Sequence, residues 1–219
     1  MLSKIDQLSF VNQRNAFFLL LAMHLAGIFG LYFSETRELF QTLTPFNLLA
    51  TAAIVLHFEE FKTPRYFLFI AITFLVGFFA EVIGVKTGLL FGEYYYGKTL
   101  GLKLFEVPLA IGLNWVIMIY GSNLLARKIS QNRTIIVLIG AAIMTLIDVI
   151  IEPVAIKLDF WTWTENEIPL QNFLGWFLLS VLLQICMTFL MPKSNNWLAI
   201  RLLYILILFF GLLNIIQIS

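Results

Sequence analysis

Long apolar runs separated by short polar breaks make up most of the chain. A helix needs about 20 apolar residues to cross the hydrocarbon core of a bilayer, and most of the runs approach this length. The pattern predicts seven membrane-spanning helices, at residues 15–33, 44–58, 65–83, 107–125, 134–151, 170–191 and 197–216. We therefore expect an all-α, polytopic integral membrane protein in which residues 1–219 form a single helical bundle.

Two breaks in the apolar pattern carry further information. The longest, residues 84–106, is rich in glycine and tyrosine, and loops of this length in compact proteins are usually functional or mobile. The other break follows Asp148, where Pro153 removes a backbone donor and disfavours helix at Glu152. We expect residues 84–106 to form part of a site, and the fifth helix to kink or stop at Glu152.

The composition leaves little room for a soluble domain. Of the 219 residues, 60% are hydrophobic and 12% are charged, and the mean hydropathy is +0.91. A net charge of +1 without a basic block gives no reason to expect nucleic acid as a partner. The single cysteine, Cys186, excludes a disulfide within the chain. Residues 1–15 are polar for too long to be a signal peptide, so we expect the first helix to stay in the mature protein.

Lysine and arginine are unevenly distributed between the two predicted sides of the membrane. The N-terminal side holds Lys4, Arg14, Lys62, Arg65, Arg127, Lys128, Arg133, Lys193 and Arg201, and the opposite side holds Arg37, Lys86, Lys98, Lys103 and Lys157. Cytoplasmic loops of membrane proteins carry the excess of positive residues. We therefore expect a cytoplasmic N-terminus, in the cytoplasmic membrane of a bacterium or an archaeon.

Three carboxyl groups lie inside predicted membrane spans, at Glu81, Asp148 and Glu152. A charged side chain in hydrocarbon costs several kcal/mol unless it is paired or faces a cavity, so such residues are candidates for a functional site. Since spans alternate in direction, all three belong to one membrane face. Asp148 and Glu152 are four residues apart, on one side of a helix. Like charges in a low dielectric cannot all ionise, so we expect at least one carboxyl group to keep its proton.

Aromatic residues gather at the same predicted face: Phe91, Tyr94, Tyr95, Tyr96, Trp115, Trp161, Trp163 and Trp176. A π face stabilises a nearby cation, and more so when water is excluded. An acid, a base and aromatic walls beside lipid suit the protonation of an alkene and the capture of the resulting carbocation. Two structural alternatives stay open: the aromatic residues form an interfacial belt, and the carboxylates only hold the bundle together by binding indole and hydroxyl donors.

Other functional classes fit the sequence less well. Membrane hydroxylases need several metal ligands, usually histidines, and this chain has only His24 and His57. We interpret His24 as a satisfied histidine at a helix interface. The predicted seventh span contains no lysine that could form a Schiff base with retinal. No inverted repeat or pair of broken helices indicates a transporter.

The polar and aromatic residues of this face belong to a series of short motifs over about residues 77–180. They are Glu81-x-x-Gly84-x-x-Thr87-Gly88-x-x-Phe91-Gly92-x-Tyr94-x-Tyr96, Leu100-Gly101, Val107-Pro108, Asn114-Trp115 with Tyr120, Asp148-x-x-x-Glu152-Pro153, Trp161-x-Trp163 and Pro169-x-x-Asn172-x-x-Gly175-Trp176. In content and order these motifs resemble a known family, the membrane carotenoid-biosynthesis proteins that include carotenoid 1,2-hydratases and bisanhydrobacterioruberin hydratase. The usual Asp-Pro of the family is Glu152-Pro153 here, which keeps a carboxylate on a longer arm.

The resemblance implies the addition of water to the terminal C1–C2 double bond of an acyclic (ψ) carotenoid end group, with lycopene or γ-carotene as example substrates and no metal or redox cofactor. The implied partners are the lipophilic carotenoid, water and membrane lipid, and association with other carotenoid enzymes is a further expectation. In this hypothesis Asp148 delivers the proton, and Glu81 or Glu152 deprotonates the attacking water. The expected substrate-binding residues are Thr87, Phe91, Tyr94, Tyr96, Asn114, Trp115, Trp161, Trp163, Asn172 and Trp176.

Two alternatives to a hydratase remain open at this point. A membrane lycopene cyclase starts from the same protonation, but a neighbouring alkene captures the cation, so the two enzymes differ in whether water is admitted. A carotenoid-binding protein without activity would hold the pigment unmodified.

Overall fold

A computed structural model describes residues 12–165 and 167–216; residues 1–11, including Lys4, lie outside this range. Within the described residues, seven helices are long and apolar enough to cross a membrane. They are α1 (Gln13–Tyr32), α2 (Ser34–His57), α3 (Pro64–Thr87), α4 (Leu109–Ile129), α5 (Arg133–Lys157), α6 (Leu170–Leu190) and α7 (Trp197–Ile215). The chain is thus the all-α polytopic membrane protein that its apolar runs predict.

Two helices are longer than their apolar runs. Helix α2 begins at Ser34, not at residue 44, because polar residues can extend a helix beyond the hydrocarbon core. The negative charge of Glu35 in its first turn also interacts favourably with the positive end of the helix dipole. Helix α3 continues to Thr87 and ends at Gly88, which has a left-handed conformation with φ 66°. The connection predicted to begin at residue 84 therefore begins at Gly88.

Helix α5 does not stop at Glu152. It continues through Pro153 to Lys157, so the prediction that the helix could end there is wrong. A proline removes one backbone donor, and neighbouring helices can compensate this loss inside a membrane bundle. The continuous helix keeps Asp148 and Glu152 one turn apart on the same side.

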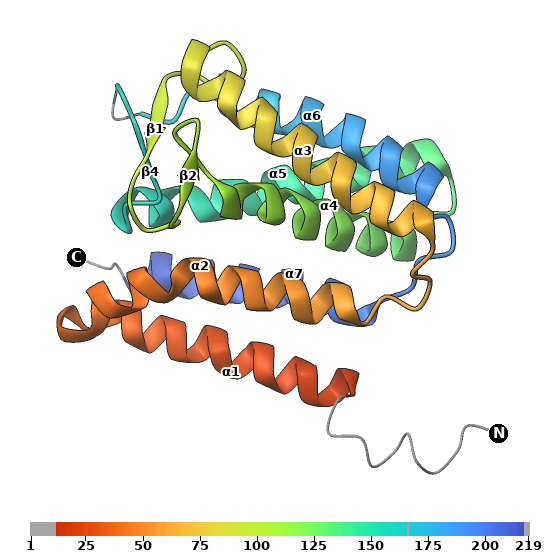
Figure 1. Cartoon of the computed structure of the whole chain (residues 1–219), viewed down its shortest axis with the longest axis horizontal. Helices are drawn as coiled ribbons and strands as arrows, with labels where there is room; N and C mark the ends of the chain where they lie inside the picture. The colour runs from red at the N-terminus through yellow and green to blue at the C-terminus, as the bar shows by residue number, and fades with distance from the viewer. Residues whose placement is uncertain (1–11, 166, 217–219) are drawn as a thin grey trace.

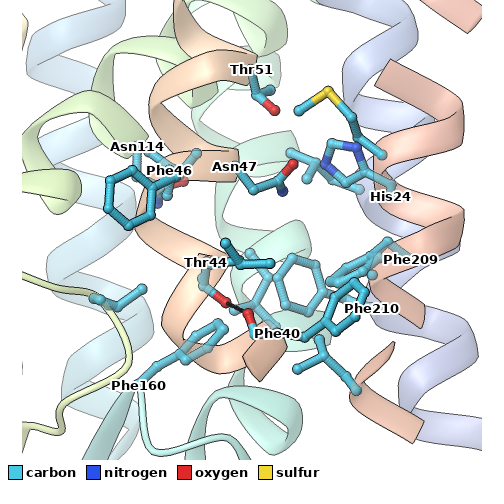
Figure 2. A pocket seen from close by; sticks show the side chains of 18 of the residues that line it. His24, Phe40, Thr44, Phe46, Asn47, Thr51, Asn114, Phe160, Phe209 and Phe210 are labelled. Atoms are coloured by element: carbon cyan, nitrogen blue, oxygen red, sulfur yellow. Dashed lines mark hydrogen bonds between the residues drawn. The ribbon is translucent and has the colours of Figure 1, made fainter. Parts of the chain in front are cut away.

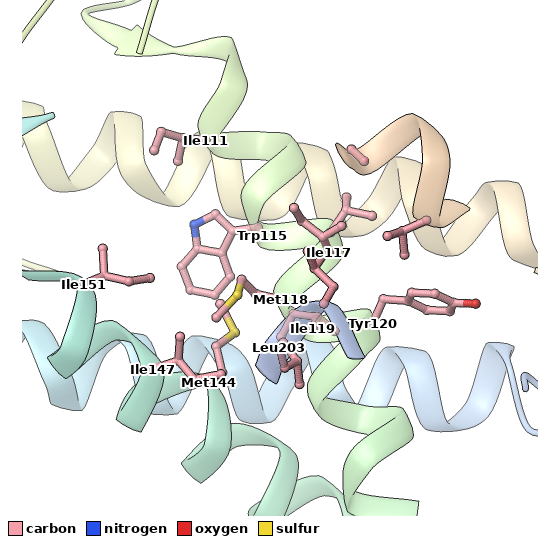
Figure 3. Close-up of a cluster of buried hydrophobic side chains, with 14 of the residues drawn as sticks. Ile111, Trp115, Ile117, Met118, Ile119, Tyr120, Met144, Ile147, Ile151 and Leu203 are labelled. Carbon is pink, nitrogen blue, oxygen red and sulfur yellow. The ribbon is translucent and has the colours of Figure 1, made fainter. Parts of the chain in front are cut away.

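Helix α4 lies at the centre of the bundle and is the most buried of the seven. Together with α5 it forms a middle layer, which has α3 and α6 on one side and α1, α2 and α7 on the other (Figure 1). The core forms where Trp115 and Met118 of α4 meet Met144 and Ile147 of α5, with Leu203 of α7 beside them (Figure 3). This central helix therefore touches both the site described below and the α7 layer.

Two short sheets join the connecting loops at one end of the bundle (Figure 1). Strand β1 (Tyr94–Tyr96) pairs antiparallel with β4 (Trp161–Trp163), which places Tyr94 opposite Trp163 and Tyr96 opposite Trp161. Strands β2 (Lys103–Leu104) and β3 (Val107–Pro108) form a hairpin. Since side chains alternate along a strand, Tyr94 and Tyr96 are buried against the bundle and Tyr95 is exposed.

Candidate active site

Glu81 is held by three hydrogen-bond donors from two different parts of the chain. Its Oε2 atom accepts bonds from the hydroxyls of Tyr94 at 2.5 Å and Tyr96 at 2.8 Å. Its Oε1 atom accepts a bond from the indole nitrogen of Trp115 at 3.0 Å. The carboxyl group is only 2% exposed, so the β1 loop and α4 together provide the polar environment that lipid cannot.

Glu152 has a similar environment on the facing side. The indole nitrogens of Trp161 and Trp163 donate to its Oε2 atom at 2.9 and 3.0 Å, and the amide of Asn172 donates to Oε1 at 3.0 Å. The two tryptophans belong to β4 and Asn172 to α6. The β1–β4 pairing therefore brings the donors of both glutamates to one place.

Asp148 is bound differently from the two glutamates. The amide of Asn172 donates to its Oδ2 atom at 3.2 Å, so one asparagine connects Asp148 to Glu152. Within the described part of the chain, the buried Oδ1 atom of Asp148 has no hydrogen-bond partner. Three donors each suit ionised carboxylates at Glu81 and Glu152, whereas a single donor suits a carboxyl group that carries its own proton.

A small cavity lies between the two glutamates. Its volume is about 20 Å³, and roughly 10–15 Å³ is enough for one water molecule. A carboxylate offers about four acceptor positions, so Glu81 and Glu152 each keep one position after their three protein bonds. The lining residues are Glu81, Tyr94, Tyr96, Ile111, Asn114, Glu152, Trp161, Trp163, Asn172 and Trp176.

The aromatic residues of this region face the interior of the protein. The rings of Trp115 and Trp176 stack with centroids 4.5 Å apart, and Phe91, Tyr94, Tyr96 and Trp163 are also buried. Only Tyr95 among the eight predicted residues is strongly exposed, at 56%. An interfacial aromatic belt is therefore the wrong interpretation for most of them, because belt residues face lipid headgroups.

The tyrosines that bind Glu81 lie in a loop outside the spanning helices. Burial, together with the nearby charge of Glu81, raises the pKa of Tyr94 well above its usual value of 10.0. The same two causes raise the pKa of Tyr96. Both hydroxyls therefore keep their protons and remain donors to Glu81 at neutral pH.

Four of the predicted site residues do not line the cavity. Asp148 lies beyond Asn172, and Trp115 lies beside Glu81. Phe91 packs against the ring of Tyr94 with centroids 6.3 Å apart. Thr87 is exposed and bonds to the carbonyl of Ile83. Ile111, which no polar signal in the sequence marks, lines the cavity instead.

A second, larger chamber of about 400 Å³ adjoins the small cavity. It lies between α1, α2, α4, α5 and α7, and Ile111, Asn114 and Trp161 line both spaces. Its lining is mainly apolar and includes Phe40, Phe209 and Phe210 (Figure 2). The chamber is suited to an apolar ligand whose end reaches Asn114.

Helix α2 supplies polar residues to this chamber that the sequence analysis missed. Thr44, Asn47 and Thr51 all line it, at the spacing i, i+3, i+7 of one helix face. That spacing was a readable signal within an otherwise apolar run. His24 of α1 lines the chamber as well, and its Nδ1 atom lies 2.8 Å from the carbonyl of Leu20, which agrees with a satisfied interface histidine.

An open polar groove of about 390 Å³ lies on the loop side of the cavity. It is lined by Glu93, Glu165, Glu167 and Gln171, and Trp163 lines both this groove and the small cavity. The indole of Trp163 thus separates a polar space from the carboxylates that it binds.

A second buried polar network occupies the other half of the bundle. Glu59 is 3% exposed and accepts bonds from the hydroxyls of Tyr120 and Ser194. Asn123 and Gln184 bond to each other at 2.6 Å between α4 and α6. Buried polar side chains therefore occur in both halves of the bundle, because side chains on adjacent helices satisfy one another's hydrogen bonds in each half.

The chain is similar in sequence to known proteins. A family model described as "Carotenoid biosynthesis protein" matches residues 42–219. Bisanhydrobacterioruberin hydratase of Haloarcula japonica is 31% identical over 106 residues, which make up 45% of this chain and 36% of that protein. The match thus spans about a third of the relative's length. No solved structure shows a significant match.

Proposed function

Since this chain belongs to the family of carotenoid biosynthesis proteins, we propose that it is a carotenoid 1,2-hydratase. In this proposal it adds water to the terminal C1–C2 double bond of an acyclic (ψ) end group and forms a tertiary alcohol. The relative from Haloarcula japonica is named as a hydratase. The observation that carries the proposal is a cavity with room for about one water molecule between two buried carboxylates.

The proposed reaction begins with a proton from the pair formed by Asp148 and Glu152. At rest the single proton of this pair is on Asp148; in the reacting state it is on Glu152, which lines the cavity and transfers it to C2 of the alkene, leaving both carboxyl groups of the pair ionised. Positive charge then develops on the tertiary carbon C1. The stacked indoles of Trp115 and Trp176 lie beside the cavity, where their π faces stabilise the cation.

The cavity water completes the addition. Its oxygen attacks C1 while Glu81 accepts the released proton, so that one hydrogen and one hydroxyl are added across the double bond. Glu81 then releases this proton to water and the Asp148–Glu152 pair takes up another, which restores the resting state. Tyr94 and Tyr96 orient Glu81 through their two hydrogen bonds to Oε2. Asn114 lines both cavity and chamber, and we assign it to the junction where the water meets the alkene.

The chamber supplies a route for a lipophilic substrate. Leu43 and Phe46 of α2 line it and are 43% and 65% exposed. Because α2 spans the membrane, exposed side chains here face lipid, and the chamber opens sideways into the bilayer. A carotenoid end group could enter from lipid without crossing water.

Two observations favour a hydratase over a cyclase. A cyclase must keep water away from the cation, yet the small cavity here fits one water molecule beside two free acceptor positions. The polar groove that meets this cavity at Trp163 provides a source of replacement water. A protein that only binds carotenoid has no need for either feature.

Co-expression in bacteria that make acyclic carotenoids tests this proposal. One host should produce lycopene and a second a hydroxylated acyclic carotenoid, and the extracted pigments are resolved by chromatography and mass spectrometry. We expect a product heavier by one or two waters. A product of unchanged mass but altered retention would indicate a cyclase, and unmodified pigment in both hosts would contradict an enzymatic role on these substrates.

A further inference from the structure

The small cavity between the carboxylates has one wall residue that no step of the proposed hydration uses. Among the described residues that line this cavity, Ile111 alone has a purely aliphatic side chain. The other nine carry carboxyl, amide, phenolic hydroxyl or indole groups. An aliphatic group beside a water position forms no hydrogen bond, so Ile111 contributes to the shape of the cavity and not to its polarity.

Ile111 also borders the chamber that receives the substrate in the proposed reaction. Three residues line both spaces: Ile111, Asn114 and Trp161. The indole nitrogen of Trp161 donates to Glu152 at 2.9 Å, which restrains its ring, and Asn114 presents an amide. Ile111 is therefore the aliphatic part of the wall between the carotenoid end and the water.

The position of Ile111 is set by the local structure. It lies in the first turn of α4, one turn before Trp115 (Figure 3). The backbone N–H of Leu109 donates to the carbonyl of Leu102 at 3.0 Å, which ties the start of the helix to the loop before β2. A β-branched side chain in a helix has one strongly preferred rotamer, and Ile111 is only 3% exposed. Its methyl groups therefore form a stiff wall.

The volume of the cavity limits what can occupy it. It measures about 20 Å³, and one water molecule needs roughly 10–15 Å³, so the remaining space is smaller than a second water requires. Methanol adds one carbon atom to water, and ethanol adds two. Because Ile111 stands between this space and the substrate, its side chain occupies the place where those carbon atoms would lie.

Resting on the proposed function, we infer that Ile111 is a specificity-determining residue, which restricts the nucleophile to water by excluding alcohols from the cavity. An alcohol would react by the same steps: the Asp148–Glu152 pair gives a proton to C2, the alcohol oxygen bonds to C1, and the hydroxyl proton passes to Glu81. The product is a tertiary ether, heavier than the substrate by one alcohol molecule. Hydration and ether formation thus differ only in whether an alkyl group fits beside Ile111.

Stepwise truncation of Ile111 tests this inference. Ile111→Val removes one carbon atom, and Ile111→Ala removes three. The purified full-length protein in nanodiscs is supplied with the two pigments of the co-expression test, in buffer containing methanol or ethanol, and mass spectrometry measures the ratio of ether to tertiary alcohol. A pocket discriminates against one extra methylene by about 10- to 200-fold. We therefore expect the valine variant to raise the methyl ether ratio at least about tenfold over the wild type, and the alanine variant to form the ethyl ether as well.

The same two truncations at Ile119 are the matched controls. Ile119 is fully buried on α4 and is absent from the lining of all three spaces, so its variants suffer a similar loss of packing. Both should keep the wild-type ratio of ether to alcohol. If Ile111→Ala does not fold, Ile111→Val decides the question, because isoleucine to valine is a mild truncation of a core side chain.

Two results would overturn the inference: a wild type that forms the methyl ether as readily as the Ile111 variants do, or Ile111 variants whose ratio equals that of the Ile119 controls. In both cases the tertiary alcohol is still formed, so the proposed hydration stands. A wild type that forms neither alcohol nor ether from either pigment refutes the proposed reaction itself, and this inference with it.

Discussion

At the scale of single residues, the three buried carboxyl groups differ in how many donors reach them. Glu81 and Glu152 each accept three hydrogen bonds, and Asp148 accepts one. The single donor at Asp148 favours a proton on this residue of the Asp148–Glu152 pair at rest, and Glu81 is the candidate base. A structural carboxylate and a catalytic one both need indole and hydroxyl donors when they are buried. The two kinds of carboxylate therefore look alike in the sequence.

Replacing Asp148 by asparagine should abolish hydration while the protein remains folded. The amide keeps the size of the side chain but carries no acidic proton, and loss of a general acid lowers a rate by about 100-fold or more. Pigment analysis by mass spectrometry measures the product, and Glu35→Gln on the exposed start of α2 serves as control. Wild-type turnover in the Asp148→Asn variant would refute its assignment as the proton donor.

The tyrosines of the Glu81 site should make the protein sensitive to alkaline pH. The pKa of Tyr94 and Tyr96 is raised in the folded state, so above about pH 10 the unfolded chain releases protons that the folded protein retains. Stability then falls with rising pH, by up to about 1.4 kcal/mol per pH unit for each tyrosine.

Thermal unfolding in detergent between pH 8 and pH 11 measures this effect. The variant carrying Tyr94→Phe and Tyr96→Phe should lose less stability over that range than the wild type, although it is less stable at pH 8. An identical pH slope in both proteins would contradict the prediction.

At the scale of helices, close packing of α3 against α4 positions the indole that binds Glu81. A Cβ atom at Gly77 would lie 2.5 Å from the ring of Trp115, closer than any contact that atoms tolerate. Only glycine at this position lets Trp115 reach Glu81 from the neighbouring helix. The packing of two helices thus determines one hydrogen bond of the site.

We expect Gly77→Ala to lower stability by about 1–3 kcal/mol and to reduce hydration, because it displaces Trp115. Gly211→Ala is the matched control, since a Cβ atom there meets nothing within 4 Å and alanine favours helix by about 1 kcal/mol. Thermal unfolding and pigment analysis measure both variants. Equal stability and equal hydration in the Gly77→Ala and Gly211→Ala variants would contradict the prediction, because Trp115 would then have room to move away from the added methyl group.

At the scale of the whole molecule, the polar groove, the small cavity and the chamber follow one another, and each shares lining residues with the next. The open groove meets the small cavity at Trp163, and the cavity meets the lipid-facing chamber at Asn114 and Trp161. Water and a lipophilic substrate could therefore reach the carboxylates from different sides. The groove opens among the loops at the end of the bundle that holds β1 and β4.

Cysteine labelling determines which side of the membrane this groove faces. In a Cys186→Ser background, we expect a membrane-impermeant maleimide added to intact cells to label Leu102→Cys but not Ser130→Cys, because the excess of positive residues predicts a cytoplasmic α4–α5 connection. Leu102 is 77% exposed in the loop before α4. The reverse pattern of labelling would place the groove in the cytoplasm.

The sequence by itself determined the class of the protein and predicted most residues of the candidate site. Helices in a bilayer must be apolar and satisfy their own backbone groups, so their number and alternation can be read from composition along the chain. Carboxylates are rare in such helices, so Glu81, Asp148 and Glu152 could be identified as candidate functional residues. The alternating direction of successive spans then placed all three at one membrane face. Helix ends were less predictable, as α2 and α5 show, because a helix can extend past the apolar run and through a proline.

Only the tertiary structure decided which groups meet. The pairing of β1 with β4 joins residues about 67 positions apart, and no local pattern encodes that register. The chamber depends on five helices at once, so the roles of Asn47, Thr51 and Ile111 emerge only when those helices pack. Hydrogen bonding and cavity volume depend on side chains from distant segments, and for this reason the sequence indicated which residues form the candidate site but not how they are arranged.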